Sequence, residues 1–375
     1  MRVLHFYKAS FPNTAGGIEQ VINQIARGAN KLGVKTDVLS LTPDRGVART
    51  IEFNGYLVHR ARQDFQVAST GFSASVFWRF LQLARKADVI HYHFPWPFMD
   101  VVHFATRVKK PTLVTYHLDI VRQKHLLKLY RPLMYKFLAS VDRIVATSPN
   151  YLATSDVLQK FAKKVCVIPI GLDKNTYPRP MPDWLQYWRE RLGPKFFLFV
   201  GVIRYYKGLH ILLEAAQGTD YPVVIVGAGP MEEELKAQAA QLGLRNIHFL
   251  GSLPEEDKVA LLTLCYSVVF PSHLRSEAFG ISLLEGAMYG KPMISCEIGT
   301  GTTFSNIGDE TGLVVPPSDP LAFRQAMQYL WEHPEEAAEM GKRAEERYWK
   351  YFTADKMVKS YVDLYGDLAR SHHGG

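Results

Sequence analysis

The sequence lacks the features that mark a membrane-spanning or secreted protein. No apolar run approaches the roughly 20 residues needed to cross a bilayer. The apolar run at residues 3–7 ends at Lys8, too soon for the core of a signal peptide. The three cysteines, Cys166, Cys265 and Cys296, lie far apart, with no pair at metal-binding spacing. We therefore expect a reduced, cytoplasmic protein.

The positive charge is concentrated in one part of the chain. The net charge is +8, and residues 101–143 hold nine lysines and arginines against Asp119 and Asp142, a balance of +7. Charge gathered in this way indicates an anionic partner such as nucleic acid or phospholipid head groups. No known nucleic-acid-binding motif is visible, so a nucleic-acid-binding module is the weaker alternative.

Short apolar runs, each followed by polar or loop-like residues, recur along the chain. In the first half, strands are predicted at residues 3–7, 35–41, 89–93, 112–116, 143–146 and 165–168, with a helix at 18–32. In the second half, strands are predicted at residues 196–201, 223–227, 247–250, 267–270, 292–295 and 312–315, with helices at 208–216 and 231–241. This alternation is typical of an α/β fold with parallel sheets covered by helices.

One segment interrupts the alternation. It is the tryptophan-rich stretch 184–191 with the following Gly193-Pro194, which we interpret as a linker. The 375-residue chain is longer than one typical core. We predict two doubly wound domains, 1–190 and 193–352, with ligands at the C-terminal ends of their strands. An amphipathic helix at about 353–370 is expected to pack back on the first domain.

The pair Gly16-Gly17 lies between the first predicted strand and the first helix. Glycine permits the close approach of a ligand, and the start of the helix offers free N–H groups to an anion. A plain tight turn is the alternative interpretation of this motif.

Two cations, Arg204 and Lys207, follow a predicted buried strand, and Gly208 begins the next helix. At the C-terminal edge of a strand, both side chains can point at one diphosphate. Their place after a buried strand favours this role over that of a solvated surface pair.

The stretch Gly227-Ala228-Gly229-Pro230 is similar to the start of a dinucleotide-binding fingerprint, but Glu232 stands where the third glycine is needed. The acidic residues 232–234 stabilise the start of a helix and would repel a pyrophosphate. A dehydrogenase or a flavoprotein is therefore disfavoured.

Two carboxylates, Glu277 and Glu285, lie eight residues apart on either side of Phe279-Gly280-Ile281. The amides of residues 279–281 begin a predicted helix and are placed to bind an anion. Glu285 lies among apolar residues, which indicates burial, and a buried carboxylate needs a partner. Two carboxylates beside an anion site suit the recognition of a sugar nucleotide, one for the ribose hydroxyls and one for the sugar.

Together these motifs resemble the retaining glycosyltransferases of the family 4 type, which have the GT-B fold and include sucrose-phosphate synthases and bacterial mannosyltransferases. The resemblance covers nearly the whole chain and implies two facing Rossmann-like domains with the active site in the cleft between them. Its markers are Gly16-Gly17, Val89-Ile90-His91-Tyr92-His93, Tyr116-His117, Ile168-Pro169-Ile170-Gly171-Leu172-Asp173, Arg204 with Lys207, Glu277 with Glu285, and Gly312-Leu313-Val314-Val315-Pro316.

The resemblance implies a role for each residue of the candidate site. Arg204 and Lys207 would neutralise the leaving diphosphate, aided by Gly17, and Glu285 would hold the ribose hydroxyls. Glu277 and the amides of Phe279, Gly280 and Ile281 would contact the sugar hydroxyls and phosphate, and His117 would lie beside the transferred sugar. Such enzymes retain the anomeric configuration, with attack on the face of the leaving group and without the nucleophilic carboxylate of most retaining glycosidases.

Neither a metal nor another cofactor is expected. The chain has no Asp-x-Asp motif, so a divalent cation bridging the diphosphate is not indicated, and Arg204 and Lys207 would replace it. His91 and His93 are spaced as a ligand pair could be on a strand, but no cysteine or third histidine is close in the sequence. We interpret them as structural or substrate-facing residues.

The basic region also carries apolar side chains at helical spacing. Leu126, Leu127, Tyr130, Leu133, Met134 and Phe137 share one side of a predicted helix, and Lys124, Lys128 and Arg131 share another. Basic and apolar surface together indicate an interfacial membrane contact, although part of the aromatic stretch 72–81 upstream belongs to a core. We expect a peripheral enzyme on the inner face of the plasma membrane, acting on a polyprenyl-diphosphate-linked saccharide.

The donor is inferred from resemblance alone. Residues 295–304 resemble bacterial O-antigen mannosyl- and rhamnosyltransferases, which favours transfer of mannose or D-rhamnose from a GDP-sugar in O-antigen or other envelope polysaccharide assembly. Transfer from a UDP-sugar by the same fold is one alternative. A catalytically inactive scaffold of the same fold is the other, and nucleotide-sugar epimerases match these motifs less well.

Overall fold

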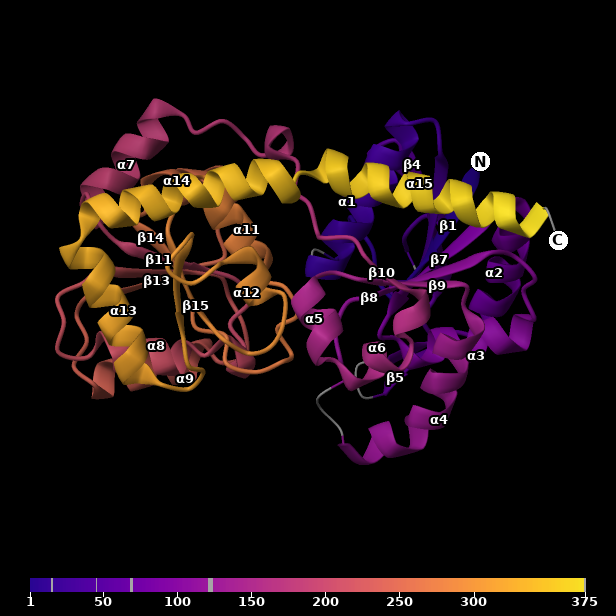
Figure 1. The fold of residues 1–375 in the computed structure, drawn as a ribbon, viewed down its shortest axis with the longest axis horizontal. Coiled ribbons are helices and arrows are strands. Elements are labelled where there is room, and N and C mark those ends of the chain that lie inside the picture. The colour runs from indigo at the N-terminus through magenta and orange to yellow at the C-terminus, as the bar shows by residue number, and fades with distance from the viewer. Residues whose placement is uncertain (15, 45, 68–69, 121–123, 374–375) are drawn as a thin grey trace. The chain divides into compact units, whose positions relative to one another are not determined.

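The computed structural model describes residues 1–375 except 15, 45, 68–69, 121–123 and 374–375. The chain divides into two compact units: the first comprises Met1–Gly171 and Ala354–Gly375, and the second comprises Leu172–Thr353. Each unit contains a sheet of mainly parallel strands with helices packed on it (Figure 1). The predicted α/β class with two Rossmann-like domains is confirmed.

The sheet of the first unit has the order β10-β9-β8-β7-β1-β2-β4-β3, and only β3 runs antiparallel to its neighbour. Its strands are β1 (Arg2–Phe6), β2 (Lys35–Thr42), β3 (Thr50–Phe53), β4 (Tyr56–Arg62), β7 (Val89–Phe94), β8 (Thr112–Tyr116), β9 (Arg143–Ala146) and β10 (Val165–Val167), and a separate hairpin joins β5 (Phe65–Val67) to β6 (Thr70–Phe72). Every residue of the central strands β7 and β8 is buried, as expected for parallel strands covered on both faces.

The helices of the first unit include one from the far end of the chain. They are α1 (Gly17–Lys31), α2 (Ser75–Lys86), α3 (Pro97–Thr106), α4 (Lys124–Ser140), α5 (Pro149–Thr154), α6 (Asp156–Lys160), the 3₁₀ turn η1 (Ala162–Lys164) and α15 (Ala354–His373). Helix α15 packs on α1 and β7, so the C-terminal segment is a layer of this unit. A Cβ at Gly28 of α1 would lie 2.5 Å from a methyl group of Val358, which is why a glycine stands at this contact.

The second unit is a six-stranded parallel sheet of order β13-β12-β11-β14-β15-β16. Its strands are β11 (Phe197–Val200), β12 (Val223–Val226), β13 (Ile247–Gly251), β14 (Ser267–Phe270), β15 (Met293–Cys296) and β16 (Gly312–Val315). Its helices are η2 (Lys174–Thr176), α7 (Pro182–Leu192), η3 (Tyr205–Lys207), α8 (Leu209–Ala216), α9 (Glu232–Gln241), α10 (Glu255–Leu264), α11 (Ile281–Met288), α12 (Thr302–Ser305), α13 (Pro320–Glu332) and α14 (Pro334–Tyr351). The strand order reverses between β11 and β14, and such a reversal is where doubly wound sheets bind ligands.

The boundary between the units differs from the one predicted. The predicted linker, residues 184–191, lies in helix α7, which belongs to the second unit and packs on α10. The indole Nε1 of Trp188 donates a hydrogen bond to Asp257 Oδ1 at 2.8 Å, and both residues are buried. The chain therefore passes from the first unit to the second between Gly171 and Leu172, about twenty residues earlier than expected.

The hairpin of β3 and β4 at the edge of the first sheet was not predicted. Its two-residue turn is Asn54-Gly55, with φ of 48° and 85°. Positive φ at both positions is the geometry of a type I′ turn, and Asn-Gly is the sequence that favours it. The signal was therefore present in the sequence.

Candidate functional site

Three loops meet at the C-terminal edge of the second sheet, and those after β11 and β14 hold most of the predicted site residues. They follow β11, β12 and β14, and the strand order places β11 between the other two. A Cβ at Gly208, where φ is +69°, would lie 2.0 Å from the carbonyl oxygen of Pro271. A Cβ at Gly227, where φ is +135°, would lie 1.9 Å from the carbonyl oxygen of Gly201. Glycine at these positions lets the three loops touch through their backbones.

Lys207 and Glu277 form an ion pair within this group of loops. Lys207 Nζ lies 2.5 Å from Glu277 Oε2, and each side chain is 12% exposed. Burial would lower the pKa of the Lys207 ammonium, but Glu277 and Tyr206 raise it, and the net shift is upward. The ammonium therefore stays charged at neutral pH, as a ligand of a diphosphate must.

The loop that carries Glu277 is fixed by hydrogen bonds to its neighbours. The His273 N–H donates to the carbonyl oxygen of Tyr206 at 3.1 Å, and its ring nitrogens contact Ser318 Oγ and the carbonyl oxygen of Tyr205. Arg275 Nη1 donates to the carbonyl oxygen of Gly299 at 2.7 Å. The loops after β11, β14 and β15 thus form one connected structure.

Helix α11 begins where the sequence predicted. Gly280 caps it at φ +85°, and Ile281 is its first residue. In the described part of the chain, the N–H groups of Phe279, Gly280 and Ile281 donate no hydrogen bond. The orphan donors of a helix start are suited to bind an anion. Phe279 itself is buried, so its contribution to a ligand would come from its backbone.

Glu285 lies one turn into α11 and is buried, with 4% of its surface exposed. Its Oε1 accepts hydrogen bonds from Lys258 Nζ at 2.8 Å and from Tyr177 Oη at 3.0 Å. Lys258 also pairs with Glu255 at 2.7 Å. The predicted partner of this carboxylate therefore exists within the protein, and the sequence analysis identified neither Lys258 nor Tyr177.

The remaining predicted site residues, Arg204, Gly17 and His117, differ in exposure and in the unit to which they belong. Arg204 precedes η3 and is exposed to solvent, and its charge acts on the pKa of Lys207, so the two cations lie near each other. Gly17 and His117 belong to the first unit. Gly17 is the first residue of α1, and His117 follows the last residue of β8 and is 4% exposed.

His117 is one end of a buried chain of histidines. Its Nε2 lies 3.0 Å from His93 Nδ1, and His93 Nε2 lies 2.9 Å from His5 Nδ1. Burial lowers the pKa of both His117 and His5 to about 3, and burial also lowers that of His93. All three imidazoles are therefore neutral at pH 7.

His91 lies beside this chain and completes the group of ring nitrogens that a metal ion could bind. The nitrogens of His5, His91 and His93 lie within 4.8 Å of one another. The two ring nitrogens of His91 are hydrogen-bonded to Tyr365 Oη and Thr115 Oγ1, each at 2.7 Å. The two ring nitrogens of His93 are hydrogen-bonded to His117 and His5. Of these six ring nitrogens, only His5 Nε2 has no hydrogen-bond partner among the described residues, so a bound cation would have to break several of these bonds.

Both halves of the chain match known protein families. Residues 15–176 match the family described as Glycosyltransferase Family 4, and residues 181–347 match the family described as Glycosyl transferases group 1.

Similar proteins and structures agree with these matches. The chain is 67% identical to D-rhamnosyltransferase WbpZ of Pseudomonas aeruginosa, over 94% of this chain and 93% of that protein. It is 50% identical to O-antigen chain mannosyltransferase C of Escherichia coli, over 99% and 100% of the two chains. The fold is similar to that of sucrose-phosphate synthase from Thermosynechococcus elongatus, with a TM-score of 0.83, 21% identity and 99% of each chain covered.

Proposed function

The chain belongs to the family 4 glycosyltransferases and is a hexosyltransferase, and from this premise we propose that it transfers mannose or D-rhamnose from a GDP-sugar. The acceptor is a lipid-linked saccharide of O-antigen assembly. Two relatives, at 67% and 50% identity, are named for rhamnosyl and O-antigen mannosyl transfer, which supports this choice. Retention of configuration and independence of metal ions are part of the same proposal.

The ion pair of Lys207 and Glu277 is the observation that carries the proposal. Its ammonium lies beside an exposed guanidinium, Arg204, and the loop of Glu277 leads directly into the N-terminus of α11. As the bond between the sugar and the diphosphate breaks, negative charge builds up on the leaving group. Lys207, held in place by Glu277, the neighbouring Arg204 and the helix N–H groups stabilise that charge, and such stabilisation is usually the largest source of catalysis in such a step.

Glu277 has two functions in this mechanism. In the absence of a donor it neutralises Lys207, and with a donor bound it accepts hydrogen bonds from hydroxyls of the sugar. Ser272 Oγ lies 3.4 Å from the same carboxylate oxygen and is a further group of this loop that the sequence analysis missed. The acceptor hydroxyl attacks the anomeric carbon on the face that the diphosphate leaves, and the diphosphate oxygen takes its proton.

Glu285 is assigned to the ribose of the donor. Tyr177 and Lys258 occupy Oε1 of this carboxylate and hold it in one orientation. A carboxylate fixed in this way accepts hydrogen bonds from vicinal hydroxyls without losing side-chain entropy on binding.

The acceptor lipid is proposed to place the enzyme at a membrane surface. Leu126 and Leu129 of α4 are 51% and 82% exposed, and Lys128 and Arg131 of the same helix are exposed beside them. Helix α4 is long enough to lie along a membrane interface, with apolar side chains in the lipid and cations at anionic head groups. No helix of the described residues is long and apolar enough to cross a membrane.

The donor is tested by calorimetric titration of GDP, UDP and ADP into the purified protein with a chelator present. Selective binding of GDP is the expected result. Preference for UDP would overturn the choice of donor and keep the transferase mechanism. Binding that requires Mg²⁺ or Mn²⁺ would contradict metal independence, and binding of no nucleotide would favour an inactive scaffold.

A further inference from the structure

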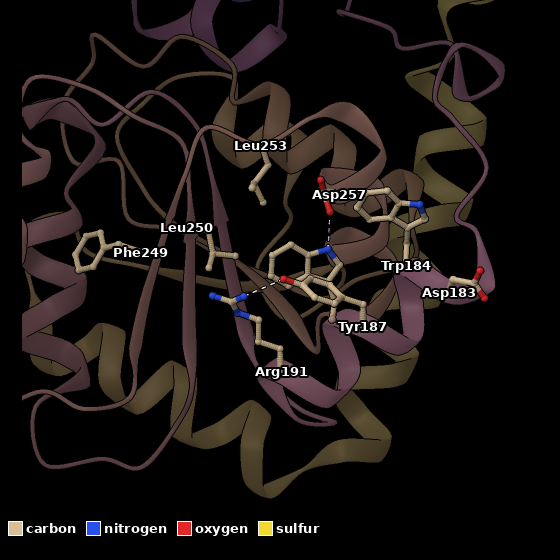
Figure 2. Close-up of a pocket in the computed structure, with 9 residues that line it drawn as sticks. Asp183, Trp184, Tyr187, Arg191, Phe249, Leu250, Leu253 and Asp257 are labelled. Carbon is tan, nitrogen blue, oxygen red and sulfur yellow. Dashed lines mark hydrogen bonds between the residues drawn. The ribbon is translucent and has the colours of Figure 1, made fainter.

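The second unit has a surface cavity. Its lining includes none of the residues assigned to sugar transfer. Its volume is about 630 Å³, within the range of small-molecule sites. Helix α7 lines it through Trp184, Tyr187 and Trp188. The end of β13 contributes Leu250, the following loop Leu253 and the start of α10 Asp257 (Figure 2).

Two aromatic side chains of the cavity wall, Tyr187 and Trp188, are held by neighbouring side chains, and a third, Trp184, is exposed. The buried Trp188 is fixed by its hydrogen bond to Asp257, and Tyr187 packs on it edge-on, with ring centroids 5.0 Å apart. Tyr187 Oη accepts a hydrogen bond from Arg191 at 2.9 Å. Trp184 is 41% exposed and has no hydrogen bond or ring contact within the described residues. An indole face is therefore open to a ligand at the rim of a preformed wall.

The cavity is separate from the proposed donor site. The two lie on different sides of α10, because Asp257 is bonded to Trp188 of α7 while the next residue, Lys258, is bonded to Glu285 of α11. A ligand can therefore bind to α7 without contact to the carboxylate assigned to ribose.

We propose that this cavity is an accessory saccharide-binding site. A pyranose ring has an apolar C–H face and a rim of hydroxyls, which match an open aromatic face bordered by hydrogen-bonding groups. The charge of the lining disfavours an anionic ligand, because two carboxylates, Asp183 and Asp257, stand against one cation, Arg191. The choice of a saccharide rests in part on the proposed function, in which the acceptor is a saccharide that remains part of the product after each transfer.

The test is ¹⁹F NMR of protein labelled with 5-fluorotryptophan, titrated with α-linked mannotriose. The chain has six tryptophans and so six resonances, and Trp184→Phe assigns that of Trp184, the exposed one of the two tryptophans that line the cavity. We expect mannotriose to shift this resonance with a Kd on the order of 1 mM, whether or not GDP is present. Trp184→Ala should weaken saturation transfer to the trisaccharide roughly three- to tenfold. Trp349→Ala is the matched control, since Trp349 is 49% exposed in the same unit and outside the cavity.

Several outcomes would overturn the accessory site. A Trp184 resonance that does not move at saturating mannotriose, or that moves with guanosine and not with the saccharide, is inconsistent with it. Equal effects of the two tryptophan variants would also remove it. None of these readouts depends on turnover, so the accessory site can fail while the transferase proposal stands, and transfer of an unexpected sugar would leave the binding test intact.

Discussion

His93 Nδ1 lies 3.0 Å from His117 Nε2, and this hydrogen bond joins the residue expected beside the transferred sugar to the centre of the first sheet. The row of hydrogen-bonded histidines continues from His93 to His5. The ring of His91 stacks on that of His93, and their centroids are 4.2 Å apart. Because neutral imidazoles each carry one proton, the tautomer of His117 is coupled to that of His93. His117 is therefore a neutral hydrogen-bonding group whose orientation is held by His93.

The burial of these histidines predicts that the first unit loses stability in mild acid. Their pKa values are lowered in the folded state, to about 3 for His5 and His117, whereas unfolded histidine titrates near 6.5. Below about pH 6.5 the unfolded state binds more protons, so stability is fully present above that pH and falls as the pH is lowered. Each buried histidine is expected to cost about 2 kcal/mol at pH 5. Urea unfolding at pH 7.5, 6.0 and 5.0 measures this loss.

The control for the acid effect is His5→Phe, which removes one buried imidazole while the other three remain. Its stability at pH 7.5 is expected to be lower, because His93 Nε2 loses its partner. Its dependence on pH between 7.5 and 5.0 should be shallower than that of the natural protein. Parallel pH curves for the two proteins would show that His5 is not held neutral.

Breaking the ion pair of Lys207 and Glu277 should affect stability and turnover in different ways. Lys207→Met or Glu277→Gln leaves one buried charge unpaired, which we expect to cost about 3 kcal/mol. The double variant removes both charges and should regain most of that stability. Its kcat should stay at least about a hundredfold below that of the natural enzyme, because the leaving diphosphate has lost a cation.

Unfolding curves and kcat for the two single variants and the double variant separate these effects. A double variant as unstable as the singles would mean that the two charges are not coupled. Wild-type turnover in Lys207→Met would remove this lysine from the mechanism.

Replacing Glu285 should weaken donor binding without unfolding the second unit. Lys258 keeps its ion pair with Glu255 in Glu285→Ala, so no charge is left unpaired. Loss of hydrogen bonds from ribose hydroxyls to a carboxylate should raise the Kd for GDP about tenfold or more. Tyr177→Phe, which keeps the carboxylate and removes one of its donors, is the matched control and should change the Kd far less. Unchanged affinity in Glu285→Ala, measured by calorimetry, would reject the ribose assignment.

A single change on α4 should release the enzyme from anionic liposomes. Leu129 is 82% exposed, so Leu129→Asp removes an apolar contact and adds a repelled charge without disturbing the core. We expect roughly tenfold weaker co-sedimentation with phosphatidylserine-containing vesicles. Leu32→Asp, at an exposed position after α1, is the control and should bind as the natural protein does. Equal binding of all three proteins, or no binding at low salt, would rule out this surface.

The sequence predicted the parts of the site that depend on strand ends. Arg204, Lys207 and Glu277 each follow a strand of one parallel sheet, and the C-terminal ends of such strands meet at one edge. The alternation of strands and helices places all three residues at this edge, and the strand order, which sets β11 beside β14, brings their loops together. The same reasoning placed Glu285 in a helix and predicted its burial correctly.

Contacts between segments far apart in the sequence were not predictable in this way. Glu285 is 27 residues from Lys258 and 108 from Tyr177, and no local pattern relates them. The histidine chain joins β1 to β7 and β8, and its neighbour His91 is held by Tyr365 of the last helix. Helix α7 was interpreted as a linker because this tryptophan-rich segment leads into Gly193-Pro194, whereas the helix packs in the second unit through a buried indole, Trp188.

The placement of α15 has a consequence for how the protein is made. The first unit is discontinuous, since its last layer is encoded after the whole of the second unit, whereas residues 172–353 are contiguous. During synthesis the second unit can be complete while β1 and β7 still lack the tyrosines that cover their histidines. A nascent or truncated chain that ends near residue 353 therefore exposes the incomplete sheet to chaperones and proteases, and the packing of the twenty residues of α15 completes the first unit.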